Sequence, residues 1–145
     1  MASDESGRVA FREGLFSGPL DRLEAVHLCG SRCDACGETG LGASVSCQNC
    51  GSGEVRETAL GDGGTLYTYT VVRHRPPGNY HGPAEFVPFG LGLVQVDDVL
   101  RVLAPIDLPI EALEIGMPLR FHPYVLRTDE QGREVVAFNY RAVGE

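Results

Sequence analysis

The chain has 145 residues, a formal net charge of −8 at pH 7 and 12 basic residues, all of them arginine. A sequence without lysine excludes Schiff-base chemistry, pyridoxal phosphate attachment and the lysine of a phosphate-binding P-loop. The acidic balance disfavours nucleic-acid binding, because proteins of that class place basic residues against phosphates and release counterions.

Residues 1–22 are polar and are interrupted by glycines and a proline. We interpret this segment as an N-terminal arm, or as a short helix between Val9 and Phe16, although a leader of this composition is also compatible with partial disorder. If the segment is an arm, its apolar residues could dock on a partner. These residues are Phe11, Leu15 and Phe16.

Residues 23–57 carry the strongest motif, and a strand over Leu23 to Leu28 is expected to lead into it. Two cysteines separated by two residues and followed by glycine occur twice, as Cys33-Asp34-Ala35-Cys36-Gly37 and Cys47-Gln48-Asn49-Cys50-Gly51. The glycine permits a positive φ, which lets backbone N–H groups point at the sulfurs. Two such turns supply four thiolates in the tetrahedral arrangement that structural Zn²⁺ takes.

The sequence therefore predicts a zinc ribbon over residues 23–57 with one structural zinc ion per chain. The expected metal ligands are Cys33, Cys36, Cys47 and Cys50. Four thiolates leave no open position on the metal, so we do not expect catalytic zinc chemistry. Iron in a rubredoxin-like site uses the same ligands, and an electron carrier is therefore an alternative function.

Nothing in the sequence resembles a catalytic constellation, and we predict no catalytic residues in this chain. The histidines are scattered without metal-ligand or catalytic spacing; they are His27, His74, His81 and His122. Cys29 is out of frame with both cysteine pairs and is expected to be a buried, inert thiol. A pair with His27 is the alternative, because residues two apart on a strand share a face.

The cysteine content and the distribution of apolar residues indicate the cellular compartment in which the protein works. Four of the five cysteines lie in metal-binding motifs, which favours a reducing environment over a disulfide framework. No apolar run reaches membrane-spanning length, and the start Met1-Ala2-Ser3-Asp4-Glu5 lacks the character of a signal peptide. We expect a soluble, cytoplasmic protein that makes no membrane contact.

Residues 58–145 alternate between turn signals and runs rich in β-branched and aromatic residues. A strand over Val55 to Leu60 is expected to join the ribbon to this part. The strands predicted beyond it are Thr65–Val72, Phe86–Val96, Val99–Leu103, Leu119–Arg127 and Arg133–Ala142. One helical turn is expected over Leu108 to Leu113. Five strands with one short helix between the third and the fourth predict a mainly β protein with an OB-fold barrel, and a sandwich is the alternative.

The long connection Arg73 to Glu85 is the surface segment to which we assign a function. Its guanidinium groups at Arg73 and Arg75 suit phosphate groups, and its aromatic residues could stack on an adenine. We expect it to contact coenzyme A or a partner subunit; an ordinary surface loop is the alternative. Tyr67, Tyr69 and Phe89 are expected in the barrel core, with a partner-binding patch as the alternative.

Taken together, these motifs resemble the acyl-CoA-associated OB-fold family, whose members carry an N-terminal rubredoxin-like zinc ribbon. The resemblance covers residues 25–142. It rests on Gly30-Ser31-Arg32-Cys33, the remaining motif cysteines, Gly64-Thr65-Leu66-Tyr67-Thr68-Tyr69-Thr70, Gly90-Leu91-Gly92-Leu93-Val94, Ile115-Gly116-Met117-Pro118-Leu119 and Val136-Ala137-Phe138.

This resemblance implies work beside a thiolase-like or hydratase-like enzyme that acts on coenzyme A thioesters. The partner chain would supply the cysteine nucleophile and the acid/base histidine. The implied partners are a thiolase-like catalytic subunit, in a hetero-oligomer, and an acyl-CoA ligand shared with it. A nucleic-acid-binding module of ribbon and OB-fold is the alternative from another class, which the acidic charge disfavours.

Overall fold

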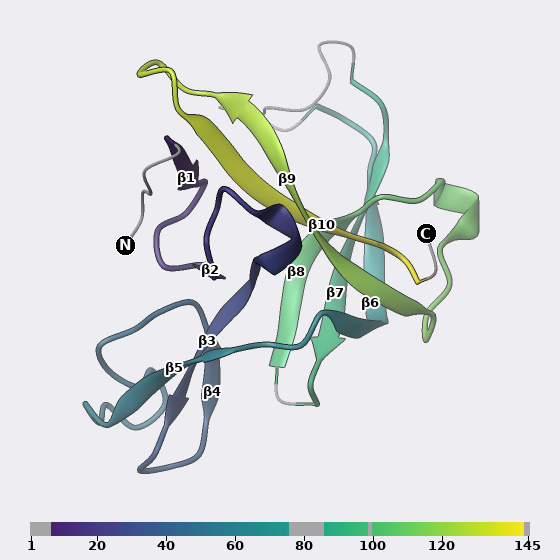
Figure 1. The fold of residues 1–145 in the computed structure, drawn as a ribbon. Coiled ribbons are helices and arrows are strands. Elements are labelled where there is room, and N and C mark those ends of the chain that lie inside the picture. The colour runs from purple at the N-terminus through teal and green to yellow at the C-terminus, as the bar shows by residue number, and fades with distance from the viewer. Residues whose placement is uncertain (1–6, 76–85, 99, 144–145) are drawn as a thin grey trace.

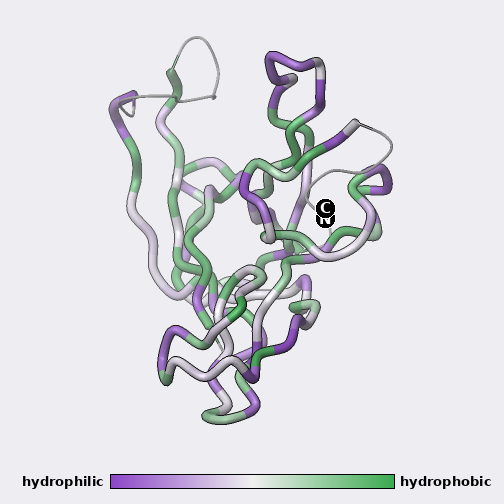
Figure 2. The backbone as a smooth tube through the Cα atoms, turned by 90° about the vertical axis from the view of Figure 1, so that its left-hand side faces the viewer, coloured by the Kyte–Doolittle hydropathy of each residue, from purple (hydrophilic) through white to green (hydrophobic). Residues whose placement is uncertain are grey.

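Two β-sheets, a barrel and a smaller ribbon-like sheet, form most of the computed structural model, which describes residues 7–75, 86–98 and 100–143 (Figure 1). Within these ranges no helix has the length and apolar character needed to cross a bilayer. The apolar stretches follow the barrel strands, whereas hydrophilic stretches concentrate in the turns (Figure 2).

Five strands close the barrel. They are β6 (Gly63–Val72), β7 (Phe89–Val96), β8 (Leu100–Ile106), β9 (Pro118–Thr128) and β10 (Glu134–Ala142). The order around the barrel is β8-β7-β6-β9-β10, and β10 returns to pair in parallel with β8 at Tyr140 and Ile106. This closure confirms the predicted OB-fold and excludes the sandwich.

Side chains of alternate residues fill the barrel. Along β7 every second residue is buried, which is the period-two pattern of a strand with one face inward. Gly92 lies where a Cβ atom would be 2.7 Å from Leu66 Cδ1, so the glycine leaves room for the Leu66 side chain inside the barrel. Tyr140 fills the centre with no solvent exposure.

Several predicted boundaries differ from the structure, most of them by one or two residues. Strand β7 begins at Phe89 rather than Phe86, because Pro88 directly before it cannot donate to a ladder. Strand β8 runs on to Ile106, past the predicted end at Leu103, and its register with β7 includes Pro105. The predicted helix is a single 3₁₀ turn, η2 (Ile110–Ala112).

The N-terminal segment forms two short strands rather than a helix. Strand β1 (Arg8–Ala10) pairs in parallel with β10, and β2 (Phe16–Ser17) pairs with β3 (His27–Cys33). Leu15 is 2% exposed, and the ring of Phe16 meets Phe138 edge-on at 6.0 Å between centroids. The apolar residues of the arm therefore pack on this chain's own barrel.

The ribbon is built on β3, which pairs with β4 (Thr39–Leu41) on one side and with β5 (Val55–Ala59) on the other. The strand predicted over Leu23 to Leu28 is wrong in its first half. There the chain makes a 3₁₀ turn, η1 (Leu23–Ala25), in which the Val26 N–H donates to the Leu23 carbonyl at 3.1 Å.

Candidate metal centre and its surroundings

The two cysteine motifs fold into the same turn. In the first, the Gly37 N–H donates to the Cys33 carbonyl at 2.9 Å, and in the second Gly51 donates to Cys47 at 2.9 Å. Both glycines have the left-handed backbone that their position requires, with φ of 84° at Gly37 and 78° at Gly51. Identical sequence frames thus give identical local geometry.

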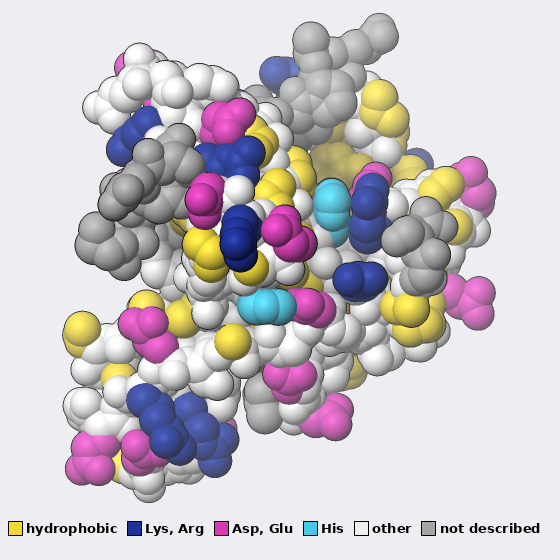
Figure 3. Space-filling model, in the orientation of Figure 1, with side chains coloured by type: hydrophobic (Ala, Val, Ile, Leu, Met, Phe, Trp, Pro, Cys, Tyr) yellow, Lys and Arg dark blue, Asp and Glu magenta, His cyan; other side chains and the backbone are white. Residues whose placement is uncertain are grey.

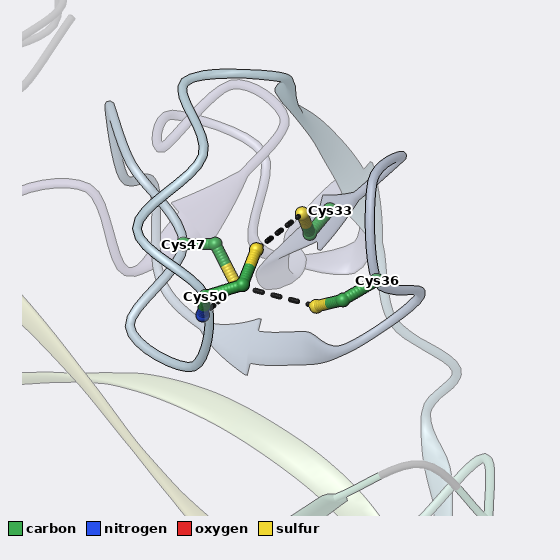
Figure 4. Close-up of side chains that lie close together, drawn as sticks. All are labelled: Cys33, Cys36, Cys47 and Cys50. Carbon is green, nitrogen blue, oxygen red and sulfur yellow. Dashed lines mark hydrogen bonds between the residues drawn. The ribbon is translucent and has the colours of Figure 1, made fainter.

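The four sulfur atoms meet between these turns (Figure 4). Cys33 Sγ lies 3.6 Å from Cys50 Sγ, Cys36 Sγ lies 3.6 Å from Cys47 Sγ, and all four atoms are within 4.8 Å of one another. Each sulfur of one turn therefore faces a sulfur of the other. The predicted ligand set is assembled in space.

This arrangement fits a tetrahedral metal. With Zn–S bonds of 2.3 Å, the sulfurs of a tetrahedral site are about 3.8 Å apart. Backbone N–H groups also point at the sulfurs, with Asn49 N at 3.3 Å and Cys50 N at 3.5 Å from Cys47 Sγ. The Asn49 side-chain amide lies 3.6 Å from Cys36 Sγ, where it supports a thiolate.

Hydrogen bonds and the neighbouring cysteines shift the pKa values of the two exposed thiols in opposite directions. Hydrogen bonds from the Glu38 backbone and then the Asn49 side chain lower the pKa of Cys36 to about 6. The Ser52 backbone lowers the pKa of Cys50, but its hydrogen bond with Cys33, its burial and the other cysteines raise that pKa to about 12. Four neighbouring thiols cannot all ionise together, so four thiolates here require a bound cation.

The predicted coenzyme A contacts lie far along the chain from this centre. Arg73 and Arg75 are both exposed and follow directly after the end of β6. The rest of that connection, including Tyr80 and His81, lies outside the described residues. The two arginines therefore lie at the end of the barrel where β6 ends.

Cys29 and His27 do not form a pair. Cys29 is 3% exposed, and its sulfur lies 3.6 Å from the Gly30 carbonyl and 3.9 Å from a Glu57 carboxylate oxygen. Burial, and then the Glu57 charge, raise the pKa of Cys29. The His27 ring nitrogen Nδ1 instead lies 2.7 Å from Asp62 Oδ1. Cys29 is the buried thiol that the sequence predicts.

The three aromatic residues that we predicted for the barrel core differ in how far they are buried. Tyr69 packs against the core, whereas Tyr67 is 49% exposed and carries the Arg101 guanidinium 3.8 Å above its ring. Phe89 is partly buried, and its ring lies edge-on to Phe86 at 6.2 Å. The prediction for Tyr67 is wrong because the register of β6 with β7 shifts at a bulge between Leu66 and Thr68, which interrupts the alternation that would place Tyr67 on the same face as Tyr69.

An apolar groove of about 1080 Å³ runs beside β8 and η2, and sequence reasoning missed it. Its exposed apolar residues include Phe11, Val87 and Leu103, which are 47%, 59% and 61% exposed. These residues come from three segments that are distant in the chain. No local pattern could have grouped them.

Fold and site together define a protein made of a four-cysteine ribbon and an OB-fold barrel. Residues 57–122 match the family described as the ChsH2, C-terminal OB-fold domain. A "DUF35 domain-containing scaffold protein" of Pyrococcus furiosus is 28% identical over 122 residues, which are 83% of this chain and 86% of that protein.

Among solved structures, a chain of an "Ltp2-ChsH2(DUF35) aldolase" superposes with a TM-score of 0.58 and 26% sequence identity. The match covers 80% of this chain and 84% of that chain. Residues 57–122 of this chain are therefore similar to the ChsH2 C-terminal OB-fold domain, and most of the chain is similar to two proteins described with the name DUF35. These similarities are consistent with the acyl-CoA-associated OB-fold family that its sequence resembles.

Proposed function

We propose that this chain is a non-catalytic subunit of a heteromeric enzyme that processes acyl-CoA, and that its partner chain supplies the catalytic residues. The observation that carries the proposal is the match over 80% of this chain to a chain described as part of an aldolase. The relative described as a scaffold protein supports the same role. We infer a cytoplasmic complex, because four cysteines in a metal site need a reducing compartment.

Within this role, a thiolase is the partner that we propose. The motifs that resemble the acyl-CoA-associated family, among them Gly64 to Thr70, support it. The length and single-chain layout are most similar to the small subunit of benzoylsuccinyl-CoA thiolase, which acts in anaerobic toluene degradation. We take that enzyme as the specific hypothesis to test.

The metal has a structural role in this proposal. Four thiolates within 4.8 Å of one another fit one zinc ion and leave no position for a substrate. The zinc would hold the ribbon as a rigid extension of the barrel, which is what an assembly subunit needs. A red, iron-containing preparation would instead support an electron carrier.

Arg73 and Arg75 are the residues that we propose for contact with coenzyme A phosphates, in a site shared with the partner. Both are exposed, and a guanidinium group binds phosphate through two parallel hydrogen bonds. In the assembled enzyme, R73Q combined with R75Q should weaken acyl-CoA affinity by about tenfold or more. R127Q, at an exposed arginine of β9, is the matched control. Unchanged affinity in the double variant would refute this contact.

The assembly itself is tested by purifying a tagged full-length chain from cells that express it naturally. Mass spectrometry then identifies any protein that co-purifies in stoichiometric amounts, and metal analysis gives the zinc content. A thiolase-like chain supports the full proposal. An aldolase or a hydratase supports the subunit role and refutes the thiolase. Recovery of the chain alone, or with nucleic acid, refutes the subunit role.

A further inference from the structure

A cleft of about 360 Å³ opens beside the 3₁₀ turn η1, against strands β9 and β10 of the barrel. Figure 3 shows histidine, arginine and acidic side chains interspersed on this face of the molecule. Apolar residues form part of the lining; they are Leu23, Val26, Phe121 and Pro123. The polar lining residues are Glu24, Asp62, Arg120, His122 and Arg141.

Two arginines occupy directly opposed positions on the two neighbouring strands beside this cleft. Arg120 on β9 and Arg141 on β10 are direct partners in the antiparallel register, so their Cβ atoms lie about 5 Å apart. Like charges in directly opposed positions destabilise a sheet unless an anion lies between them. This pair stands out in a chain whose net charge is −8.

The neighbouring carboxylates balance this charge only in part. Arg141 Nη2 lies 3.0 Å from Asp107 Oδ2, outside the cleft lining. Asp62 within the cleft is engaged by the His27 ring at 2.7 Å. Glu24 is exposed on η1, and no ion pair within the described ranges involves Arg120. Arg120 is therefore the cation of this cleft that still lacks a counterion.

A third donor adjoins the arginine pair. His122 lies two residues after Arg120 on the same face of β9, and its ring stacks on Tyr124 with 5.9 Å between centroids and 12° between planes. Burial, and then the charge of Arg141, lower the pKa of His122, which favours the neutral ring. A neutral imidazole still offers one N–H to an acceptor.

We propose that this cleft binds the phosphate or carboxylate group of a small organic molecule, with Arg120 and Arg141 as the charged donors and His122 as the third. The apolar lining would contact the organic part. The cleft is separate from the proposed coenzyme A contacts. Arg120 pairs with Gly63 at the start of β6, whereas Arg73 follows its end, and a strand of 10 residues spans about 33 Å. Anion binding at this cleft can therefore be tested without a partner enzyme.

The test uses the metal-loaded full-length chain with two probes, inorganic phosphate and succinate. Binding is followed by calorimetry and by the NMR resonances of the His122 ring. We expect saturable binding of at least one probe, together with a shift of those resonances. R120Q should weaken binding by about tenfold, because it removes one charge-assisted donor pair. R120Q should not lower the unfolding midpoint, because Arg120 is exposed and its removal relieves the repulsion with Arg141.

R127Q is the matched control, because it removes the same charge from an exposed position on the same strand. Binding of phosphate alone would assign a phosphate ligand, and binding of succinate alone a carboxylate ligand. Absence of saturable binding for both probes would overturn the proposal. An equal loss in R127Q and R120Q would also overturn it, because the effect would then be one of net charge.

Discussion

Replacement of Cys36 by serine tests whether this residue is a metal ligand or an ordinary surface cysteine. Cys36 is exposed, and serine is close to it in size and shape. A surface substitution of this kind changes the free energy of unfolding by no more than about 0.5 kcal/mol. If Cys36 binds zinc, the same exchange removes one of four metal–sulfur bonds.

The structure sets the size of the expected effect. Between residues 31 and 57 the buried hydrophobic residues are Cys33 and Cys47, so the ribbon has no apolar core besides its own ligands. Structural zinc contributes about 10–16 kcal/mol to folding in small domains. A quarter of that is on the order of 3 kcal/mol, or a loss of metal affinity of roughly 100-fold. The ribbon should therefore unfold locally while the barrel remains folded.

Metal analysis and native-state hydrogen exchange test this expectation in C36S. We expect less than one zinc per chain after dialysis, and loss of protection in β4 and β5 but not in β6 and β7. The control Q48A changes an exposed residue inside the second cysteine motif and should retain zinc and protection. If C36S keeps its zinc and its exchange pattern matches that of Q48A, the ligand assignment is refuted.

Substitutions of Tyr140 and Leu15 test the packing of the barrel and of the N-terminal arm. Tyr140 is fully buried and its hydroxyl has no hydrogen-bond partner among the described residues, so Y140F should raise the free energy of unfolding in urea by about 1 kcal/mol; a loss of stability would contradict this. Burial, and then Asp62 and Asp97, raise the pKa of Tyr140, so the unfolded chain loses this proton first and stability should fall as the pH rises above about 10. Y140F should show a smaller fall between pH 9 and pH 11, and an equal slope would count against this cause. L15A should destabilise the isolated chain by about 2–5 kcal/mol, because Leu15 is 2% exposed; a change below about 0.5 kcal/mol would mean that the arm does not pack on its own barrel in solution.

Features that depend on local spacing could be predicted from the sequence. The cysteine turns need only a few residues and a glycine, so Cys33 to Gly37 and Cys47 to Gly51 specify their own geometry. The barrel strands follow from runs of β-branched and aromatic residues between turn signals, which are local as well. The turn at Asp97 and Asp98, where φ is 53° and 55°, belongs to the same group.

Features that depend on distant partners could not be predicted. Strand β1 exists because Arg8 to Ala10 pair with Glu134 to Val136, far away in the chain. The arginine pair of the cleft depends on the register of β9 and β10, which shifts at a bulge between Val135 and Val136. A shift of one residue moves each side chain to the other face, and the sequence carries no local signal for it.

The most direct test of the subunit role is to separate the purified complex into its chains and recombine them. We predict that the partner alone loses most of its acyl-CoA-dependent activity or its stable assembly. Adding this chain back in its zinc-loaded form should restore both. Full activity and unchanged assembly of the partner without this chain would contradict a subunit role.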